Sequence, residues 1–347
     1  MTASGATAPA ARLGVVLVNW NRWRDTIECL ESLRRAGTPM RIVVVDNASA
    51  DESVAHILAW AAGTEDSTPA DAAMARFSRP ACPKPITVLR LDAAAAATTP
   101  PAGDGITLID GGGNLGFAGG NNAGLRHLMG DPGIDYFWLL NNDTVVDSAA
   151  PGALLARCDA THNLGQCGTV VRFYHRPDVV QALNGSRFNR FTGNSTGLGT
   201  EQAASAPFDP ALVARRTDFV LGASLTVSRA FLATIGLMNE RYFLYFEEID
   251  WATRNRGRFA TAFAHGAVVY HKEGGSIGSS SVKGGRSETS EYWLMRSRLR
   301  FVELYYPRLL TLHRLYGAAQ IAVRLWRRQP GKARVMLRAL AGKAREG

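Results

Sequence analysis

Short apolar segments that end in asparagine or aspartate constrain the fold more than any other feature of this chain. They are Leu13–Val18 followed by Asn19, Ile42–Val45 followed by Asp46, and Tyr136–Leu140 followed by Asn141. Short apolar segments rich in β-branched or aromatic side chains are typical of buried strands. Apolar residues at helical spacing in 25–35 place a helix between the first two strands. We therefore predict an α/β fold with a mostly parallel central sheet and helices on both faces.

Polar residues at the predicted strand ends define the candidate site. In an open parallel sheet, ligands bind beyond the carboxyl ends of the strands, so residues far apart in sequence meet at one edge. A histidine ends a further apolar segment, Ala267–Tyr270, in the same way. We expect these polar residues to line one cleft. They are Asn19, Asn21, Asp46, Asn142, Asp143 and His271.

The segment Asn141–Thr144 offers one carboxylate beside neutral oxygen atoms. Mg²⁺ or Mn²⁺ needs little more than one or two carboxylates together with substrate phosphates, and Asp143 is the natural ligand. His271 could bind the same ion or a diphosphate. Each has an ordinary structural alternative, which is a capped turn for Asn141–Thr144 and a structural histidine for His271.

The segment Asn114–Asn122 is rich in glycine and leads into a predicted helix over 122–129. Small residues such as Gly116 let a phosphate or a sugar approach the backbone, and a helix N-terminus favours anions. The segment has no Walker lysine and does not match the dinucleotide-binding fingerprint. An ordinary glycine turn is the alternative.

Three acidic residues, Glu247, Glu248 and Asp250, lie within four positions of one another. A carboxylate near a metal-bound diphosphate can act as a general base, and close like charges can raise one pKa toward neutrality. The alternative is a group of acidic residues at a helix start, where the helix dipole favours them.

Three segments depart from the alternating pattern. Residues 1–12 are predicted to be flexible. Residues 61–105 are rich in alanine and proline and indicate a surface insertion, with a strand at 86–91. Residues 184–200 are rich in Gly, Asn and Ser, and we expect a mobile loop there.

The positive charge of the chain lies at its C-terminal end. Residues 296–347 contain 13 Lys or Arg and two Glu, a net charge of +11, whereas the whole chain carries +9. Pro307 ends a helix that begins near 288. We predict that 307–347 is a basic amphipathic helical extension that binds an anionic membrane surface. A solvated basic helix or a contact in a homo-oligomer is the alternative. We expect no nucleic-acid partner, because aromatic residues mostly lie outside this basic segment.

The N-terminus lacks the charged start and apolar core of a signal peptide, and the chain has no stretch of 18 apolar residues. None of the four cysteines forms a C-x-x-C pair. We expect a cytoplasmic protein with reduced thiols that associates peripherally with the inner face of the plasma membrane.

Read in order, eight motifs resemble glycosyltransferase family 2, the inverting GT-A type, and within it the rhamnosyltransferase-like branch. The motifs are Val15–Asn21, Val43–Asp51, Asn114–Gly124, Trp138–Thr144, Gly222–Leu225, Tyr242–Asp250, Tyr270–His271 and Arg296–Arg300. The resemblance implies a Rossmann-like GT-A catalytic domain over residues 13–306. It assigns no role to the insertion at 61–105.

The resemblance implies donor-binding roles for residues that match the family motifs. Asp46 would hold the pyrimidine base, and Asn19 and Asn21 would line the nucleotide pocket. Asn114 and Gly116 would lie against the ribose, the diphosphate or the sugar.

The implied metal ligands are Asp143 and His271. Asp143 ends a metal-binding motif that is usually written with two aspartates, whereas the earlier positions here are Asn141 and Asn142. Asn142 would instead contact the nucleotide sugar. Fewer carboxylates imply a weaker Mg²⁺ or Mn²⁺ site that depends on the substrate.

Glu248 falls where the family has its catalytic base, which is more often aspartate. Glu247 remains open for the same role, and Asp250 would support the helix or orient the acceptor. The implied mechanism is a single inverting displacement, in which the base deprotonates an acceptor hydroxyl that attacks the anomeric carbon.

The leading hypothesis is transfer of L-rhamnose from dTDP-rhamnose to a lipid-linked cell-envelope or O-antigen glycan. The same motifs would serve UDP-galactofuranose or another UDP-sugar. A non-catalytic nucleotide-sugar-binding protein stays open, because Asn141, Asn142 and Glu248 are unusual choices. A sugar nucleotidyltransferase needs a glycine-rich, basic triphosphate loop, which residues 13–24 do not supply.

Overall fold

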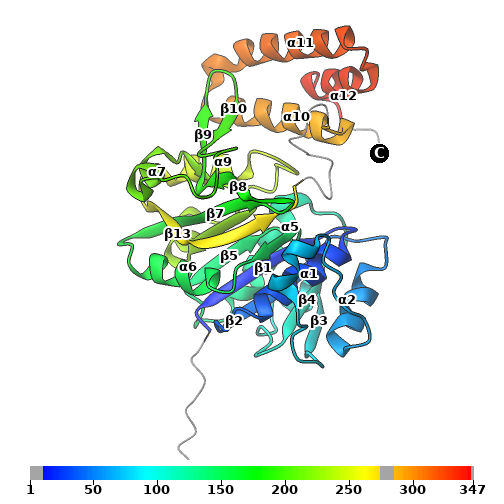
Figure 1. Ribbon diagram of the computed structural model, residues 1–347. Helices are drawn as coiled ribbons and strands as arrows, with labels where there is room; N and C mark the ends of the chain where they lie inside the picture. The colour runs from blue at the N-terminus through cyan, green and yellow to red at the C-terminus, as the bar shows by residue number, and fades with distance from the viewer. Residues whose placement is uncertain (1–10, 274–284, 345–347) are drawn as a thin grey trace, which may run out of the picture.

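The structure, a computed structural model, describes residues 11–273 and 285–344. An α/β body carries the candidate site, and three C-terminal helices stack beside it at one end (Figure 1). None of the helices in the described ranges has both the length and the apolarity needed to cross a bilayer.

A ten-stranded mixed sheet forms the centre of the body. Its order is β3-β4-β2-β1-β5-β12-β7-β13-β6, and β8 pairs with β7. The strands are β1 Leu13–Asn19, β2 Met40–Asp46, β3 Val88–Asp92, β4 Ile106–Asp110, β5 Tyr136–Leu140, β6 Thr144–Val146, β7 Leu164–Phe173, β8 Arg176–Leu183, β12 Ser224–Ser228 and β13 Ala260–His271. The five neighbouring strands β3, β4, β2, β1 and β5 pair in parallel, and so do β7 and β13. Strand β12 lies between β5 and β7 and runs antiparallel to both. The predicted α/β class with a mostly parallel sheet is confirmed.

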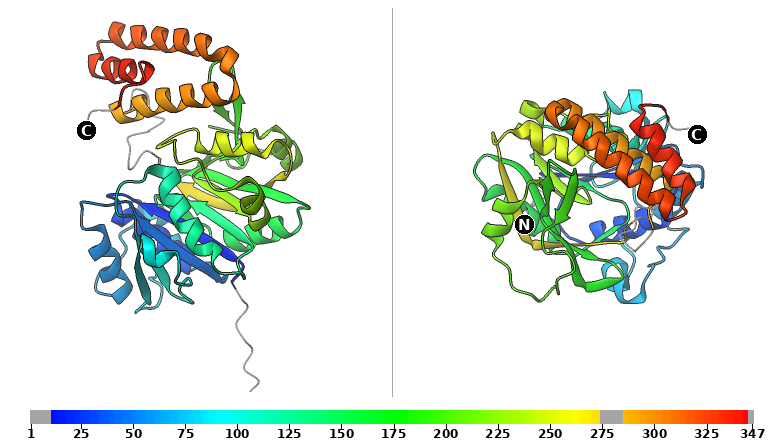
Figure 2. Two further views of the ribbon diagram at one scale, coloured as in Figure 1. Left: turned by 180° about the vertical axis from the view of Figure 1, so that it is seen from behind. Right: turned by 90° about the horizontal axis from the view of Figure 1, so that it is seen from above.

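Helices cover both faces of the sheet, because successive side chains of a strand point to opposite sides. In β1, Val15 and Leu17 join one apolar cluster and Val16 joins another. The first cluster includes residues of α1 Trp23–Arg34, α2 Ser53–Ala62 and α6 Ala150–Asp159. The second includes residues of α5 Gly116–Met129, α8 Arg229–Ile235 and α9 Glu247–Asn255. Figure 2 shows α5 on the face opposite to α1 and α2.

Helix α5 begins at Gly116, so most of the predicted glycine-rich loop is helical. The glycines bring the helix close to the sheet. A Cβ atom on Gly120 would lie 2.8 Å from Val18 Cγ1, and one on Gly124 would lie 2.5 Å from Val16 Cγ1. These glycines therefore serve the packing of α5 on β1 rather than a flexible loop.

The segment 184–200, predicted as a mobile loop, is instead a hairpin. It contains β9 Gly185–Asn189 and β10 Asn194–Gly197, which form a small sheet with β11 Phe219–Val220. Phe188 stabilises it by packing edge-on against Phe246 and Phe301. The loop prediction was wrong because these tertiary contacts leave no periodic pattern in the sequence.

The segment 61–105 is more integrated than an insertion. The strand expected at 86–91 is present as β3, the edge strand of the central sheet. Short helices η1 Ala72–Met74, α3 Ala75–Ser78 and α4 Ala93–Ala96 lie in the same segment. Met74 is buried with Val145 and Tyr270, and Glu31 of α1 accepts hydrogen bonds from Cys82 N and Lys84 Nζ.

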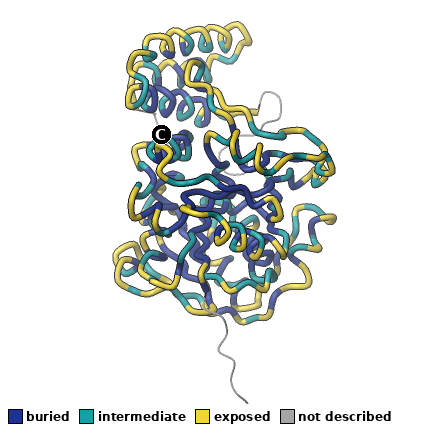
Figure 3. The backbone as a smooth tube through the Cα atoms, turned by 90° about the vertical axis from the view of Figure 1, so that its left-hand side faces the viewer, coloured by how far each residue is buried: buried dark blue, intermediate teal, exposed yellow. Residues whose placement is uncertain are grey.

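The C-terminal helices are α10 Glu288–Tyr305, α11 Leu310–Trp326 and α12 Pro330–Leu340, with η2 Pro307–Leu309 before α11. Met295 and Leu299 of α10 are buried with Met336 of α12. Helix α10 therefore packs against the helices that follow Pro307. Helix α7 Pro210–Arg216 lies on the body. Figure 3 shows buried strands in the body and a largely exposed outer helix, α11.

Candidate functional site

The carboxyl ends of β1, β2 and β5 hold a hydrogen-bonded polar network. Asn19 Nδ2 donates to Asp46 Oδ1 (2.7 Å), and Asn19 Oδ1 accepts from Thr26 Oγ1 (2.7 Å). Asn142 Nδ2 donates to the same threonine oxygen (2.9 Å). The structure thus brings three of the predicted site residues together, and it adds Thr26 of α1, which sequence reasoning missed.

Asp46 is held tightly by the loop that follows it. Ser49 Oγ donates to Asp46 Oδ1 (2.6 Å), and Ser49 N donates to Asp46 Oδ2 (3.0 Å). Ser49 is therefore part of the network around Asp46. Asp51, just before α2, accepts a local hydrogen bond at its Oδ1 from Ser53 N (3.2 Å), and the N-cap residue of α2 is Glu52.

Two asparagines beside Asp46 connect neighbouring loops. Asn21 Oδ1 accepts from Ala50 N (2.7 Å), so this side chain joins the loops after β1 and β2. Asn47 Nδ2 donates to Gly116 O (3.0 Å), while its buried Oδ1 has no hydrogen-bond partner in the described residues. Asn47 follows Asp46 directly and lies in the same motif, Val43–Asp51.

The N-terminus of α5 contacts another loop of the protein. Asn114 is exposed, and its Oδ1 accepts from Gly116 N (3.1 Å). Gly116 has φ +69°, and a Cβ atom there would overlap Phe243 O. Phe117 N donates to the same carbonyl (2.9 Å). Close approach to Phe243 therefore accounts for glycine at 116, and of the two predicted residues only Asn114 is exposed.

Asp143 and His271, the two predicted metal ligands, lie side by side. Strands β6 and β13 pair antiparallel, and this places His271 Nε2 3.1 Å from Asp143 Oδ1. His271 Nδ1 lies 3.0 Å from Gln181 Oε1 on β8, which fixes the ring. Gln181 was missed because its neighbours depend on pairing between distant strands.

The electrostatics of this pair favour opposite charges. Burial acts to raise the pKa of Asp143, but the charges of His271 and Lys272 hold that pKa below its ordinary value. Burial acts to lower the pKa of His271, but the charge and hydrogen bond of Asp143 raise it above its ordinary value. A cation between the two side chains would replace the histidine proton in its interaction with the carboxylate.

The geometry fits a hexacoordinate cation such as Mg²⁺ or Mn²⁺. Ligand atoms about 2.1 Å from an ion in adjacent octahedral positions stand about 3 Å apart, and the observed separation is 3.1 Å. Because Gln181 contacts Nδ1 of His271, the other ring nitrogen, Nε2, faces Asp143. Within the described residues no group of three or more His, Cys, Asp or Glu side chains could hold an ion. A bound substrate would have to supply the remaining ligands.

The acidic residues at the start of α9 have three different environments. Asp250 is buried and pairs with Arg254 Nε (2.7 Å) and Tyr305 OH (2.6 Å), so it holds helices together, as expected. Glu247 is 1% exposed. Glu248 is half-buried and lies against the backbone of Gly222. Of the three carboxylates, Glu248 is the one that is both accessible and free of an ion pair in the described structure.

Burial raises the pKa of Glu248 above its ordinary value. Burial and the charge of Glu248 together raise the pKa of Glu247 well above its ordinary value. A carboxylate with a raised pKa is a stronger base, which is the property that a general base requires.

Backbone contacts connect Glu248 to the metal pair. Asn141, two residues before Asp143, donates its N–H to Ala223 O (3.0 Å). Gly222 precedes Ala223 and lies against Glu248. The segments that carry the candidate base and the candidate metal ligands are therefore in contact through residues 222–223.

Comparison with known proteins gives one match in sequence. No protein-family model matches the chain. A low-salt glycan biosynthesis hexosyltransferase from Haloferax volcanii is 28% identical over 160 residues. The match covers 44% of this chain and 47% of that protein, so the chain spans about half the length of the curated relative it matches.

Two solved structures align with most of the chain. A mannosyltransferase from Pyrobaculum calidifontis, in complex with GDP-mannose and Mn²⁺, aligns with a TM-score of 0.50 and 13% identity, over 96% of this chain and 87% of its own. TarS from S. aureus, in complex with UDP-GlcNAc, aligns with a TM-score of 0.49 and 12% identity, over 95% of this chain and 81% of its own. The chain has a GT-A-like fold, as the mannosyltransferase alignment shows.

Proposed function

We propose that this chain is an inverting hexosyltransferase that uses a nucleotide-sugar donor. The Asp143–His271 pair carries the proposal, because its spacing and its place beyond the sheet suit a cation on a diphosphate. The partial match to a curated hexosyltransferase and the GT-A-like fold support the same activity.

Glu248 is the proposed catalytic base. Its carboxylate removes the proton from an acceptor hydroxyl, whose oxygen attacks the anomeric carbon from the face opposite the leaving diphosphate. Asp143 and His271 would hold Mg²⁺ or Mn²⁺, which would neutralise charge on the diphosphate. Asp46, with Asn19 and its network, holds the nucleotide base on the other side of the site.

The proposed donor is dTDP-rhamnose, and the proposed acceptor is a lipid-linked cell-envelope glycan. The motif resemblance supports this choice of sugar, and UDP-galactofuranose or another UDP-sugar is the alternative. The competing function is a protein that binds a nucleotide sugar without transferring it.

Helix α11 supports a place at an anionic membrane surface on the cytoplasmic side. Four of its five exposed large apolar residues recur at helical spacing on one face, Leu325 being the exception, and Trp326 is 81% exposed. They are Leu312, Leu315, Val323 and Trp326. Exposed arginines lie near both ends of the helix and along it, namely Arg308, Arg314, Arg327 and Arg328. Apolar and basic residues together are typical of an interfacial helix.

Release of nucleoside diphosphate from a panel of dTDP- and UDP-sugars tests the proposal, with Mn²⁺ and a membrane-lipid extract as the acceptor source. We expect release with one donor, lost in Glu248→Gln and in Asp143→Asn. Glu303→Gln, which changes an exposed glutamate on α10, is the matched control. Nucleotide binding without release from any donor would favour the non-catalytic binder, and an absence of nucleotide binding would reject both functions.

A further inference from the structure

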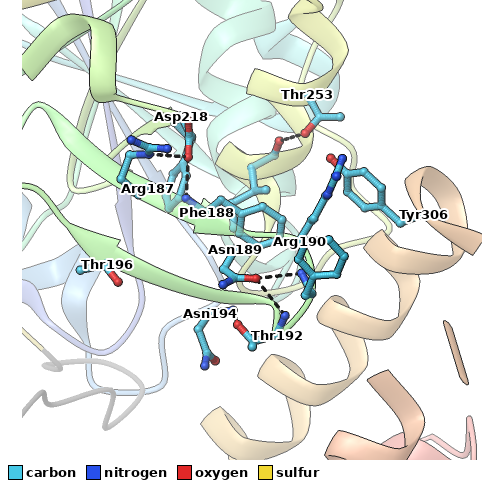
Figure 4. Close-up of a pocket in the computed structure, with 13 residues that line it drawn as sticks. Arg187, Phe188, Asn189, Arg190, Thr192, Asn194, Thr196, Asp218, Thr253 and Tyr306 are labelled. Carbon is cyan, nitrogen blue, oxygen red and sulfur yellow. Dashed lines mark hydrogen bonds and ion pairs between the residues drawn. The ribbon is translucent and has the colours of Figure 1, made fainter. Parts of the chain in front are cut away.

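A pocket of about 930 Å³ is lined by residues other than the metal pair and the Asp46 network. Its walls come from the β9–β10 hairpin, from β11, from α9 and from Tyr306 after α10 (Figure 4). Pockets that bind small molecules measure about 300–1,000 Å³, so this one has room for more than a single sugar ring.

Aromatic side chains form the apolar part of the pocket. Phe188 is fixed by its edge-on packing against Phe301. Phe191 at the hairpin tip is 51% exposed. Figure 4 shows Arg190 extending beside Tyr306 along one wall. Flat apolar faces with free polar groups around them suit a ligand that has both C–H faces and hydroxyl edges.

The polar groups of the pocket include both donors and acceptors. Asn189 Oδ1 accepts the N–H groups of Phe191 (2.9 Å) and Thr192 (3.2 Å), which leaves its amide NH₂ for a ligand. Asn194 donates to Tyr316 OH (3.3 Å), which leaves its amide oxygen. Such neutral groups match the hydroxyls of a carbohydrate.

The charges of the pocket suit a phosphate group less well. Arg187 is paired with Asp218 (3.1 Å), so its charge is neutralised. The backbone N–H groups of the hairpin tip are already used, since Gly193 N donates to Asn189 O (2.7 Å) and the two before it bind the Asn189 side chain. Arg190 alone among the lining cations has no carboxylate partner in the described residues. A phosphate site would need several converging donors.

Two residues that line the pocket, Ile249 and Phe219, lie close in sequence to Glu248 or to a residue that contacts it. Ile249 lines the pocket and adjoins Glu248 on α9. Phe219 lines it as well, and Gly222, which contacts Glu248, lies three residues further along, a span of about 10 Å in extended chain. An acceptor with more than one sugar could therefore reach both places.

We infer that this pocket binds a carbohydrate segment of the acceptor, away from the hydroxyl that receives the new sugar. The inference rests on the proposed transferase activity. Hydrolysis of the nucleotide-sugar donor can be measured separately, without an acceptor.

Transfer kinetics with the membrane-lipid extract test the inference. We expect Phe191→Ala to raise the acceptor KM about tenfold because an aromatic contact is lost. The donor KM and the slow hydrolysis of the donor alone should stay as in the wild type. Leu212→Ala changes a comparably exposed apolar residue on α7 and serves as the control. An unchanged acceptor KM in Phe191→Ala would overturn the inference. If the wild type itself does not hydrolyse any donor, that result counts against the proposed function.

Saturation-transfer NMR with soluble rhamno- and galacto-oligosaccharides, and with inorganic pyrophosphate, gives a direct test of binding. We expect an oligosaccharide to bind the wild type and Leu212→Ala, and to bind Phe191→Ala weakly. Binding of pyrophosphate alone, lost in Arg190→Gln but kept in the exposed α7 control Arg215→Gln, would replace the sugar by a phosphate group. Binding of neither probe would also overturn the inference.

Discussion

Gly222 lies directly against the carboxylate of Glu248, so that a Cβ atom on this glycine would overlap Oε1. The glycine belongs to the break between β11 and β12, and Glu248 belongs to the first turn of α9. The absence of a side chain at 222 thus sets the position of the candidate base.

Replacement of Gly222 by alanine should therefore reduce activity more than stability. The overlapping atom is the end of a flexible side chain, which can move away at small cost, but the base would then be displaced by an ångström or more. Such a displacement can cost about a hundredfold in rate. We expect kcat to fall by that order in Gly222→Ala with little change in melting temperature. Gly152→Ala on α6, where the nearest atom lies 3.7 Å from the new Cβ, should leave kcat unchanged and raise the melting temperature slightly, because alanine favours a helix more than glycine does.

Glu247 should make stability fall with rising pH. Its pKa in the folded state is well above the ordinary 4.5. The folded state thus binds more protons than the unfolded state, and this contribution to stability is full below about pH 4.5 and is lost as pH rises toward the folded-state pKa. Glu247→Gln removes this titration, so its melting temperature should decline less than that of the wild type as the pH rises above about 4.5. Equal slopes for the two proteins would contradict the raised pKa of Glu247, and Glu303→Gln should follow the wild type.

Gln181 should tune the affinity for the cation through His271. Gln181→Leu removes the oxygen that lies 3.0 Å from His271 Nδ1. Loss of such a supporting contact costs about 10–100-fold in metal affinity. We expect the Mn²⁺ concentration for half-maximal diphosphate release to rise by that factor, and excess Mn²⁺ to restore activity. Gln320→Leu on α11 provides the control, and a fall in activity that excess Mn²⁺ does not reverse would argue against the role.

The exposed face of α11 should bind anionic membranes. Trp326→Ser combined with Leu315→Ser removes two exposed apolar side chains without touching the core. We expect the wild type to sediment with vesicles that contain phosphatidylglycerol, and less so as salt is raised, since each basic residue contributes about 1 kcal/mol at such a surface. The double variant should bind weakly, and Leu212→Ser should bind like the wild type. If the double variant and Leu212→Ser sediment with the vesicles to the same extent, α11 is not the helix that contacts the membrane.

The strands and helices around the site could be predicted because each has a local signal. The runs at Leu13–Val18 and Ile42–Val45 are apolar and β-branched, and the polar residues after them mark the sheet edge where ligands bind. The proximity of Asp143 and His271 followed from the same rule.

The remaining features depended on contacts that a sequence does not display. The β9–β10 hairpin is rich in polar residues, and Phe188 holds it only because Phe246 and Phe301 come from elsewhere in the chain. Gln181 reaches His271 only because β8 and β13 both pair with β7. The helical start of α5 was hidden by glycines that are there to fit against Val16 and Val18.

Helix α10 contributes to two apolar cores at once. Phe301 and Val302 are buried with residues of the body, whereas Met295 and Leu299 are buried with α12. The helix has 18 residues, a length of about 27 Å. Because α10 packs into both cores, it restricts rotation of α11 and α12 relative to the body. If α11 binds a bilayer, Glu248 is therefore held at a set distance from the lipid surface. The protein would then favour acceptors whose growing end lies at that distance from the membrane.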